Sequence, residues 1–118
     1  MAEVLKGDER ASFVAVLAEW NVGGNPAPVE WAGRAEKDRE AYLPGLTPKQ
    51  IKEQLHLYAL NNGEIARVDE QRQEYRHWRC HYDLWPTIEG RVYYFETRFD
   101  CEDPAEPVIY IMRFKPDR

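Results

Sequence analysis

EYRHWRCHYDLWPTIEGRVYYFETRF, residues 74–99, decides the fold of this chain. β-prone residues alternate with polar ones on both sides of a segment rich in turn-forming residues. This pattern predicts two long strands joined by a loop at 86–90. Successive side chains of a strand point to opposite faces of a sheet. The stretch therefore predicts an antiparallel hairpin with one apolar face and one polar face.

The two predicted faces differ in chemistry. The apolar face is expected to carry Trp78, Cys80, Tyr82 and Leu84 from the first strand and Tyr93, Phe95, Thr97 and Phe99 from the second. The polar face is expected to carry Tyr75, His77, Arg79, His81 and Asp83 beside Val92, Tyr94, Glu96 and Arg98. Two of the three histidines of the chain belong to this second set, which makes the polar face the candidate site.

Burial sets the predicted register of the hairpin. The two apolar sets share a side only if even-numbered residues oppose odd-numbered ones, because a slip of one residue turns every side chain to the other face. With a loop at 86–90, the predicted neighbours on the apolar face are Leu84 and Arg91, Tyr82 and Tyr93, and Cys80 and Phe95. On the polar face they are His77 and Arg98, Arg79 and Glu96, and His81 and Tyr94.

The composition is that of an ordinary globular protein. A chain of 118 residues with 43% hydrophobic and 31% charged residues predicts one domain over 1–118 and argues against wholesale disorder. No apolar run has the length of a membrane span, and the start lacks the pattern of a secretion signal, so a cytoplasmic protein without a membrane partner is expected. The net charge of −5 argues against indiscriminate nucleic-acid binding, but acids gathered at 100–106 leave the sheet face free to be basic.

The cysteines and histidines do not predict a metal or a disulfide. In the predicted register Cys101 lies well away from Cys80, whereas a disulfide needs Cα atoms within about 7 Å. Neither cysteine has the spacing of a metal site. His77 and His81 are four residues apart on one strand, which separates them by about 13 Å, too far to share one zinc ion. No cofactor is expected.

The first 63 residues predict mainly helices. Helices are expected from about residue 8 to 21, over the charged segment 31–42, and from the capping box Thr47–Pro48–Lys49–Gln50 to 61–63. The first of these is also short and apolar enough over 13–20 to be a strand. The capping box is the sharpest signal, because it satisfies backbone amides that a helix start leaves unpaired.

Residues 64–118 predict an antiparallel sheet. The segment 64–69 is typical of a short edge strand, and the near-continuous apolar run Val108–Phe114 indicates a strand in the interior of the sheet. Helices followed by strands favour an α+β domain, in which N-terminal helices pack on one face of a three- to four-stranded antiparallel sheet. The opposite, polar face would remain open to a ligand.

Three segments resemble the MqsR-type toxins of bacterial toxin–antitoxin systems, which belong to the wider RelE-like group of small ribonucleases. The segments are REAYLPGLTPKQIKEQL at 39–55, HWRCHYDLWPTIEGRVYYFETRF at 77–99 and PVIYIMRFK at 107–115. The shared features are a GLT helix start, a strand with a tryptophan, a GRVYY strand and a terminal RFK strand. The resemblance implies a RelE-like sheet, cleavage of mRNA without a metal, and neutralisation by a partner antitoxin.

The resemblance also implies site positions. Carried over residue by residue, these are Arg79, which follows the tryptophan of its strand, Tyr93 and Lys115. The chain departs from the family pattern after VY, where Tyr94 and Phe95 stand in place of an aliphatic residue and a lysine. Alternation puts Tyr93 on the apolar face and Tyr94 on the polar one, so both stay candidates for the tyrosine of the site.

The polar face contains the groups that metal-free RNA cleavage requires. Such cleavage takes a base for the 2′-OH proton, an acid for the leaving 5′-oxygen and cations for the charge on the phosphorane. His81 or Glu96 is the expected base, and His77 or His81 the expected acid. Arg79, which would stabilise the phosphorane charge, and the site tyrosine, Tyr94 or Tyr93, complete the expected catalytic set. The expected substrate-binding residues are Arg98, Arg113, Lys115 and Tyr75, and the rings of Tyr75 and Tyr94 are expected to stack on unpaired bases.

Three other interpretations stay open. Arg79 and Glu96 would also form an ordinary exposed cross-strand ion pair. The acidic charge and the aromatic sheet would suit a non-catalytic protein-binding module, such as an immunity protein, an antitoxin-like factor or an adaptor. The third is a small-ligand pocket between the 47–61 helix and the sheet. The four tryptophans are expected in the core or in a lid rather than on a binding platform: Trp20, Trp31, Trp78 and Trp85.

Overall fold

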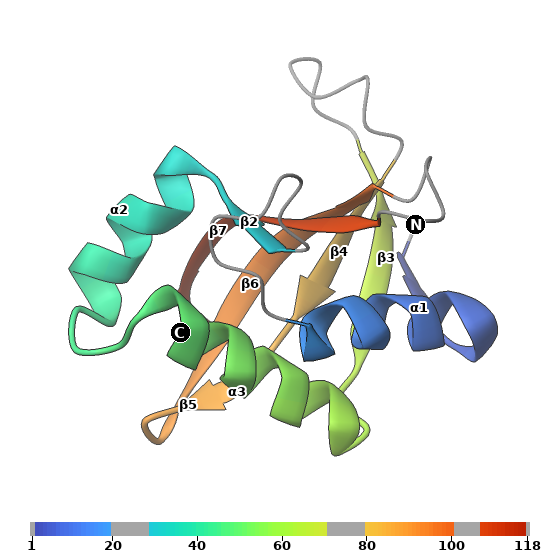
Figure 1. The fold of residues 1–118 in the computed structure, drawn as a ribbon, viewed down its shortest axis with the longest axis horizontal. Helices are drawn as coiled ribbons and strands as arrows, with labels where there is room; N and C mark the ends of the chain where they lie inside the picture. Colours follow the sequence, from blue (N-terminus) through green and yellow to red (C-terminus); the bar gives the residue numbers. More distant parts are fainter. Residues whose placement is uncertain (1, 20–28, 71–79, 101–106, 118) are drawn as a thin grey trace.

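The computed structural model describes residues 2–19, 29–70, 80–100 and 107–117 (Figure 1). In chain order its elements are β1 (Ala2–Val4), α1 (Gly7–Ala18), β2 (Val29–Trp31), α2 (Gly33–Tyr42), α3 (Pro48–Leu60), β3 (Ile65–Asp69), β4 (Cys80–Leu84), β5 (Thr87–Ile88), β6 (Arg91–Asp100) and β7 (Val108–Pro116). No helix in these ranges is long and apolar enough to span a membrane.

The helix α3 begins at the predicted capping box. Thr47 Oγ1 accepts a hydrogen bond from the Gln50 amide at 3.2 Å, and the Gln50 side chain accepts one from the Thr47 amide at 2.9 Å. Pro48 occupies the first helical position, where its missing N–H costs no intrahelical bond. The buried side of the helix includes Ile51 and Leu55, so this part of the sequence analysis is confirmed.

The central hairpin turns later in the chain than predicted, and its register differs. β4 and the short β5 pair with β6 in one continuous register, and the chain turns at Glu89 and Gly90, whose φ values are 53° and 79°. Two consecutive positive φ values are typical of the tight two-residue turns that close hairpins. Leu84 therefore opposes Phe95 and not Arg91, a shift of four residues from the predicted pairing.

The shift leaves the predicted faces intact, because four is an even number and strand side chains alternate with a period of two. Leu84 and Phe95 are fully buried on the apolar face. Tyr93 is also on this face, 4% exposed, with its ring 6.1 Å from that of Phe114. Tyr94 is therefore the tyrosine that lies on the polar face, where its hydroxyl meets Asp83.

The α+β class is confirmed, but the predicted three- to four-stranded sheet is wrong. The described strands run in the order β1-β3-β4-β6-β7-β2, with β5 beside β6, and make a seven-stranded sheet. β2 pairs parallel to β7, while every other pair is antiparallel. Two strands lie within the predicted helical half, and β3 is internal where an edge strand was expected. Strands of three residues, such as β1 and β2, are too short to produce a readable alternation.

The helices lie on the apolar side of the sheet (Figure 1). Phe13 of α1 packs on Tyr82 and Phe99, with ring centroids 5.7 and 5.4 Å apart. α1 and α3 contact each other, and α2 packs against β7. β7 is internal, as its apolar run predicted, because β6 and β2 flank it. The described helices therefore cover the apolar face of the sheet and do not cover the polar face.

The charged helix α2 has a structural function that the sequence did not reveal. Asp38 is 8% exposed, and its Oδ2 accepts a hydrogen bond from the Phe114 amide at 2.9 Å. β2 accompanies β7 only as far as Ile111, so this amide would otherwise have no strand partner. Asp38 thus satisfies a buried N–H at the place where the sheet edge is not covered by a strand.

Candidate functional site

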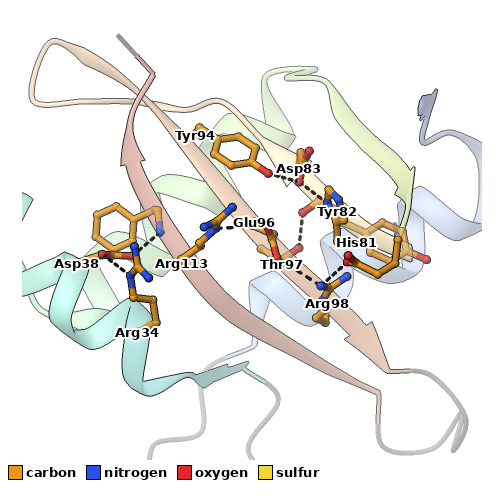
Figure 2. A network of polar contacts seen from close by, with 12 residues as sticks. Arg34, Asp38, His81, Tyr82, Asp83, Tyr94, Glu96, Thr97, Arg98 and Arg113 are labelled. Atoms are coloured by element: carbon orange, nitrogen blue, oxygen red, sulfur yellow. Dashed lines mark hydrogen bonds and ion pairs between the residues drawn. The ribbon is translucent and has the colours of Figure 1, made fainter. Parts of the chain in front are cut away.

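The candidate site lies on the polar face, on β4, β6 and β7 (Figure 2). Pairing arranges its side chains in rows across the three strands. One row is Asp83, Glu96 and Arg113, and a second contains Tyr94 and Lys115. We use "polar face" below for the residues His81, Asp83, Tyr94, Glu96, Arg98, Arg113 and Lys115.

A bulge in β7 brings both cations of that strand onto the polar face. The β6–β7 register shifts between Glu96 and Thr97, so that Arg113 opposes Glu96 while Ile111 opposes Thr97. On a regular strand residues 111 and 113 would share a face. The extra residue, Met112, instead allows Ile111 to be fully buried in the core while Arg113 and Lys115 turn to the polar side.

Three side chains on this face form a connected acid–base group, the His81–Asp83–Tyr94 cluster. His81 Nδ1 is 2.8 Å from Asp83 Oδ1, and the Tyr94 hydroxyl donates to the same oxygen at 3.0 Å (Figure 2). Because a carboxylate accepts, His81 Nδ1 donates this hydrogen bond, which makes Nε2 the lone-pair nitrogen of the neutral imidazole. Within the described ranges Nε2 has no protein partner, and the His81 side chain is 13% exposed. The cluster therefore presents a basic nitrogen held by a buried carboxylate.

The environment keeps Tyr94 protonated. Burial raises the pKa of the Tyr94 hydroxyl above its ordinary value, and the negative charge and hydrogen bond of Asp83 raise it further, while Arg113 opposes this shift. A tyrosinate beside a buried carboxylate would be unfavourable. Tyr94 is thus a neutral hydrogen-bond donor over the physiological range of pH.

The deeper end of the polar face is closed by an ion network. Arg98 is fully buried and lies 2.6 Å from Glu70 and 3.4 Å from Glu96, with side-chain exposures of 2% and 3% for the two acids. It also donates to the Cys80 carbonyl at 3.1 Å. Arg98 was predicted to bind substrate and Glu96 to act as a base. Their burial among opposite charges places both side chains beneath the surface.

The opposite end of the face is open and cationic. The Arg113 side chain is 41% exposed, with its Nε 3.4 Å from Glu96 Oε1, and Lys115 is exposed on the next row. Among the described residues, neither Lys115 Nζ nor the terminal amines of Arg113 have a hydrogen-bond partner. The two residues are two apart on one strand, hence about 7 Å from each other. This spacing allows both to contact one phosphate group from the same side.

The remaining predicted site residues fall elsewhere. Tyr75, His77 and Arg79 lie outside the residues that the structure describes, so their predicted roles stay predictions. Tyr93 lies in the core, which separates it from the polar face. Within the described ranges no three acidic, cysteine or histidine side chains form a group that could hold a metal ion.

Sequence reasoning placed Asp83 on the polar face but gave it no role. The available signal was its position two residues after His81, which puts both side chains on one face of a strand. Trp85 was also missed, because it was assigned to the core or a lid. Its ring lies 6.1 Å from that of Tyr94, tilted by 41°.

A cavity of about 180 Å³ lies away from these residues, at the β1 edge of the sheet. Its walls include Glu3, Glu9 and Arg67, and Arg67 is 2.5 Å from Glu3 and 2.8 Å from Glu9. Three of the charged residues that line this cavity are therefore already paired with each other. The predicted small-ligand pocket beneath α3 does not coincide with it.

The raised tyrosine pKa values predict a loss of stability in alkali. Burial also raises the pKa of Tyr82, chiefly by desolvation. The folded protein keeps protons that the unfolded chain releases near pH 10, so this stabilisation is complete below about pH 10 and declines as the pH rises above it. We expect urea midpoints to fall between pH 9 and 11, and to fall less for Tyr94→Phe. An equal decline in the two proteins would contradict the contribution of Tyr94.

Comparisons with known proteins identified no relative of this chain. No protein-family model, no curated protein and no solved structure matches the chain.

Proposed function

We propose that this protein is a toxin-type endoribonuclease that cleaves mRNA in the cytoplasm without a metal. The observation that carries the proposal is the His81–Asp83–Tyr94 cluster beside two exposed cations, Arg113 and Lys115. The cluster supplies proton transfer, and the cations supply charge for a phosphate. RNA is the polymer that such a combination cleaves, because it carries its own nucleophile, the 2′-hydroxyl group.

Each proton in the proposed reaction has a source and a destination. His81 Nε2 accepts the 2′-OH proton, and the 2′-oxygen attacks phosphorus while the bond to the 5′-oxygen breaks. As the Tyr94 hydroxyl proton passes to the leaving oxygen, the Nδ1 proton of the His81 imidazolium passes to Tyr94 through their common partner, Asp83, so that no free tyrosinate forms. Exchange of the Nε2 proton with water then returns His81 to its starting tautomer. Arg113 and Lys115 stabilise the charge that develops on the phosphate oxygens. The products are a 2′,3′-cyclic phosphate and a 5′-hydroxyl group.

The resemblance to MqsR-type toxins supports this proposal at one position and modifies it at another. Lys115, in the RFK segment, lies exposed beside Tyr94, as a substrate-binding lysine would. Tyr93, which the resemblance favours, lies in the core, so the proposal assigns the tyrosine of the site to Tyr94. A cognate antitoxin that covers the polar face is the partner that the resemblance implies.

The test uses purified protein and two RNA oligonucleotides that differ by one atom. The first is a single-stranded RNA end-labelled for mapping, and the second carries a 2′-deoxyribose at the mapped cleavage position. We expect cleavage of the first in the presence of EDTA, with 2′,3′-cyclic phosphate ends, and no cleavage of the second at that position. Induced in bacteria, the protein is expected to arrest growth and leave cut transcripts.

Two results would overturn the proposal. One is intact RNA after incubation with folded protein at high concentration. The other is cleavage that continues at the deoxy position, since this would exclude the 2′-hydroxyl as nucleophile. Intact RNA together with a stable complex with another protein would favour the protein-binding module.

A further inference from the structure

An aromatic pair borders the acid–base cluster on the polar face. Trp85 follows β4 directly, and its indole ring lies 6.1 Å from the Tyr94 ring at an angle of 41°. Trp85 is partly exposed, as is Tyr94. The Tyr94 hydroxyl is fixed by Asp83, so the ring beside Trp85 is held in place. A partly exposed indole supported by a second, fixed ring is a rigid apolar surface within a polar site.

The two exposed cations lie on the other side of Tyr94. Lys115 pairs with Tyr94 across β6 and β7, whereas Trp85 approaches Tyr94 from the β4 side. Tyr94 is therefore the middle of a row with an aromatic ring at one end and an ammonium group at the other. The row crosses two strand spacings, about 10 Å. One nucleotide can bridge that span, with its base on the aromatic end and its phosphate on the cationic end.

We propose, on the basis of the proposed function, that Trp85 is the nucleobase-binding residue of the site and that the substrate is single-stranded. A base stacks on the indole of Trp85, its ribose lies over Tyr94 and its phosphate contacts Lys115 and Arg113. This pose brings the 2′-hydroxyl group to the His81–Asp83–Tyr94 cluster. The faces of paired bases are covered by their neighbours in a duplex, so only an unpaired base offers the surface that this residue binds.

Stacking on an aromatic side chain also explains how a chain with a net charge of −5 binds RNA. Each stacked base contributes about 1–3 kcal/mol whatever its identity, because every base has a π-face. Two phosphate-binding cations alone give weak attachment that falls with added salt. The apolar contact at Trp85 is expected to persist at salt concentrations that weaken the contacts of Arg113 and Lys115.

The experiment measures binding separately from cleavage. The probe is a fluorescent, single-stranded, 2′-fluoro RNA oligonucleotide, which lacks the nucleophile and stays intact, and the readout is fluorescence anisotropy. Trp85→Leu is expected to weaken binding about 5- to 150-fold, the equivalent of one stacked base. Trp85→Phe keeps a π-face and is expected to lose less. Trp31→Phe is the matched control, since Trp31 packs against Phe114 on the apolar side, and its binding is expected to be unchanged.

The outcomes distinguish this subsite from the proposed function. Unchanged binding by folded Trp85→Leu overturns the subsite even if the wild type cleaves RNA. Weakened binding by Trp85→Leu, with Trp85→Phe between it and the wild type, supports the subsite even if no cleavage occurs. A duplex probe that binds as tightly as the single strand, or equal loss in Trp85→Leu and Trp31→Phe, also overturns it. Urea unfolding of each variant confirms that the changes in binding do not come from misfolding.

Discussion

Replacement of Arg98 by methionine is expected to lower the free energy of unfolding by about 3–5 kcal/mol. The guanidinium is fully buried between Glu70 and Glu96, and both acids are themselves almost completely buried. Methionine resembles arginine in length but carries no charge, so the two carboxylates lose the cation that they share. Burial of such charges in a medium of low dielectric constant is costly once this buried cation is removed, although Arg113 still lies 3.4 Å from Glu96.

The matched control is Arg34→Met, which removes an arginine whose own side chain is exposed, although its partner Asp38 is buried. Arg34 lies 3.4 Å from Asp38, but its side chain is 67% exposed. Exposed pairs contribute only about 0.2–1 kcal/mol because solvent screens them. Urea unfolding of the two variants at one pH and ionic strength gives the comparison. If Arg98→Met loses no more than Arg34→Met, the buried network does not hold the deeper end of the polar face.

Local signals in the sequence were sufficient for the helix start at Thr47 and for the two faces of the hairpin. A capping box depends only on residues within one turn, and alternation depends only on neighbours along one strand. The helix start was confirmed, as were the two faces over the described residues 80–99, where alternation correctly separated Tyr93 from Tyr94. The same alternation put His81 and Asp83 on one face, which is the part of the candidate site that the sequence could predict.

The features that the sequence did not predict depend on distant partners. The register is set by a tight turn in which Glu89 adopts a positive φ of 53°. Glycine adopts positive φ readily and other residues rarely do, so a glutamate at this position did not indicate where the turn lies. The bulge at Met112 exists only relative to the neighbouring strand β6, and no pattern in the sequence of β7 predicts it. Arg98 looked like a surface cation, because its burial results from Glu70, a residue 28 positions earlier in the chain. The sequence alone therefore does not show whether a charged residue on a polar face is exposed to solvent or buried in an ion pair.

Replacement of His81 by glutamine is expected to lower the rate of RNA cleavage by about 10²–10⁴-fold, the usual contribution of a positioned general base. Glutamine can still donate a hydrogen bond to Asp83, but it has no basic nitrogen to take the 2′-OH proton. Folding should therefore be largely preserved while the reaction is lost. The measurement is kcat/KM on a single-stranded RNA, with urea unfolding in parallel to verify that the variant is folded.

The matched control is His56→Gln, which makes the same chemical change on α3, on the other side of the sheet. Its cleavage rate is expected to equal that of the wild type. The comparison also guards against a contaminating ribonuclease, because such an activity would survive in every preparation. If His81→Gln cleaves within about threefold of His56→Gln, the general-base role of His81 is excluded. Loss of activity in His81→Gln alone would show that the imidazole beside Asp83, and not the general basicity of the polar face, drives proton transfer.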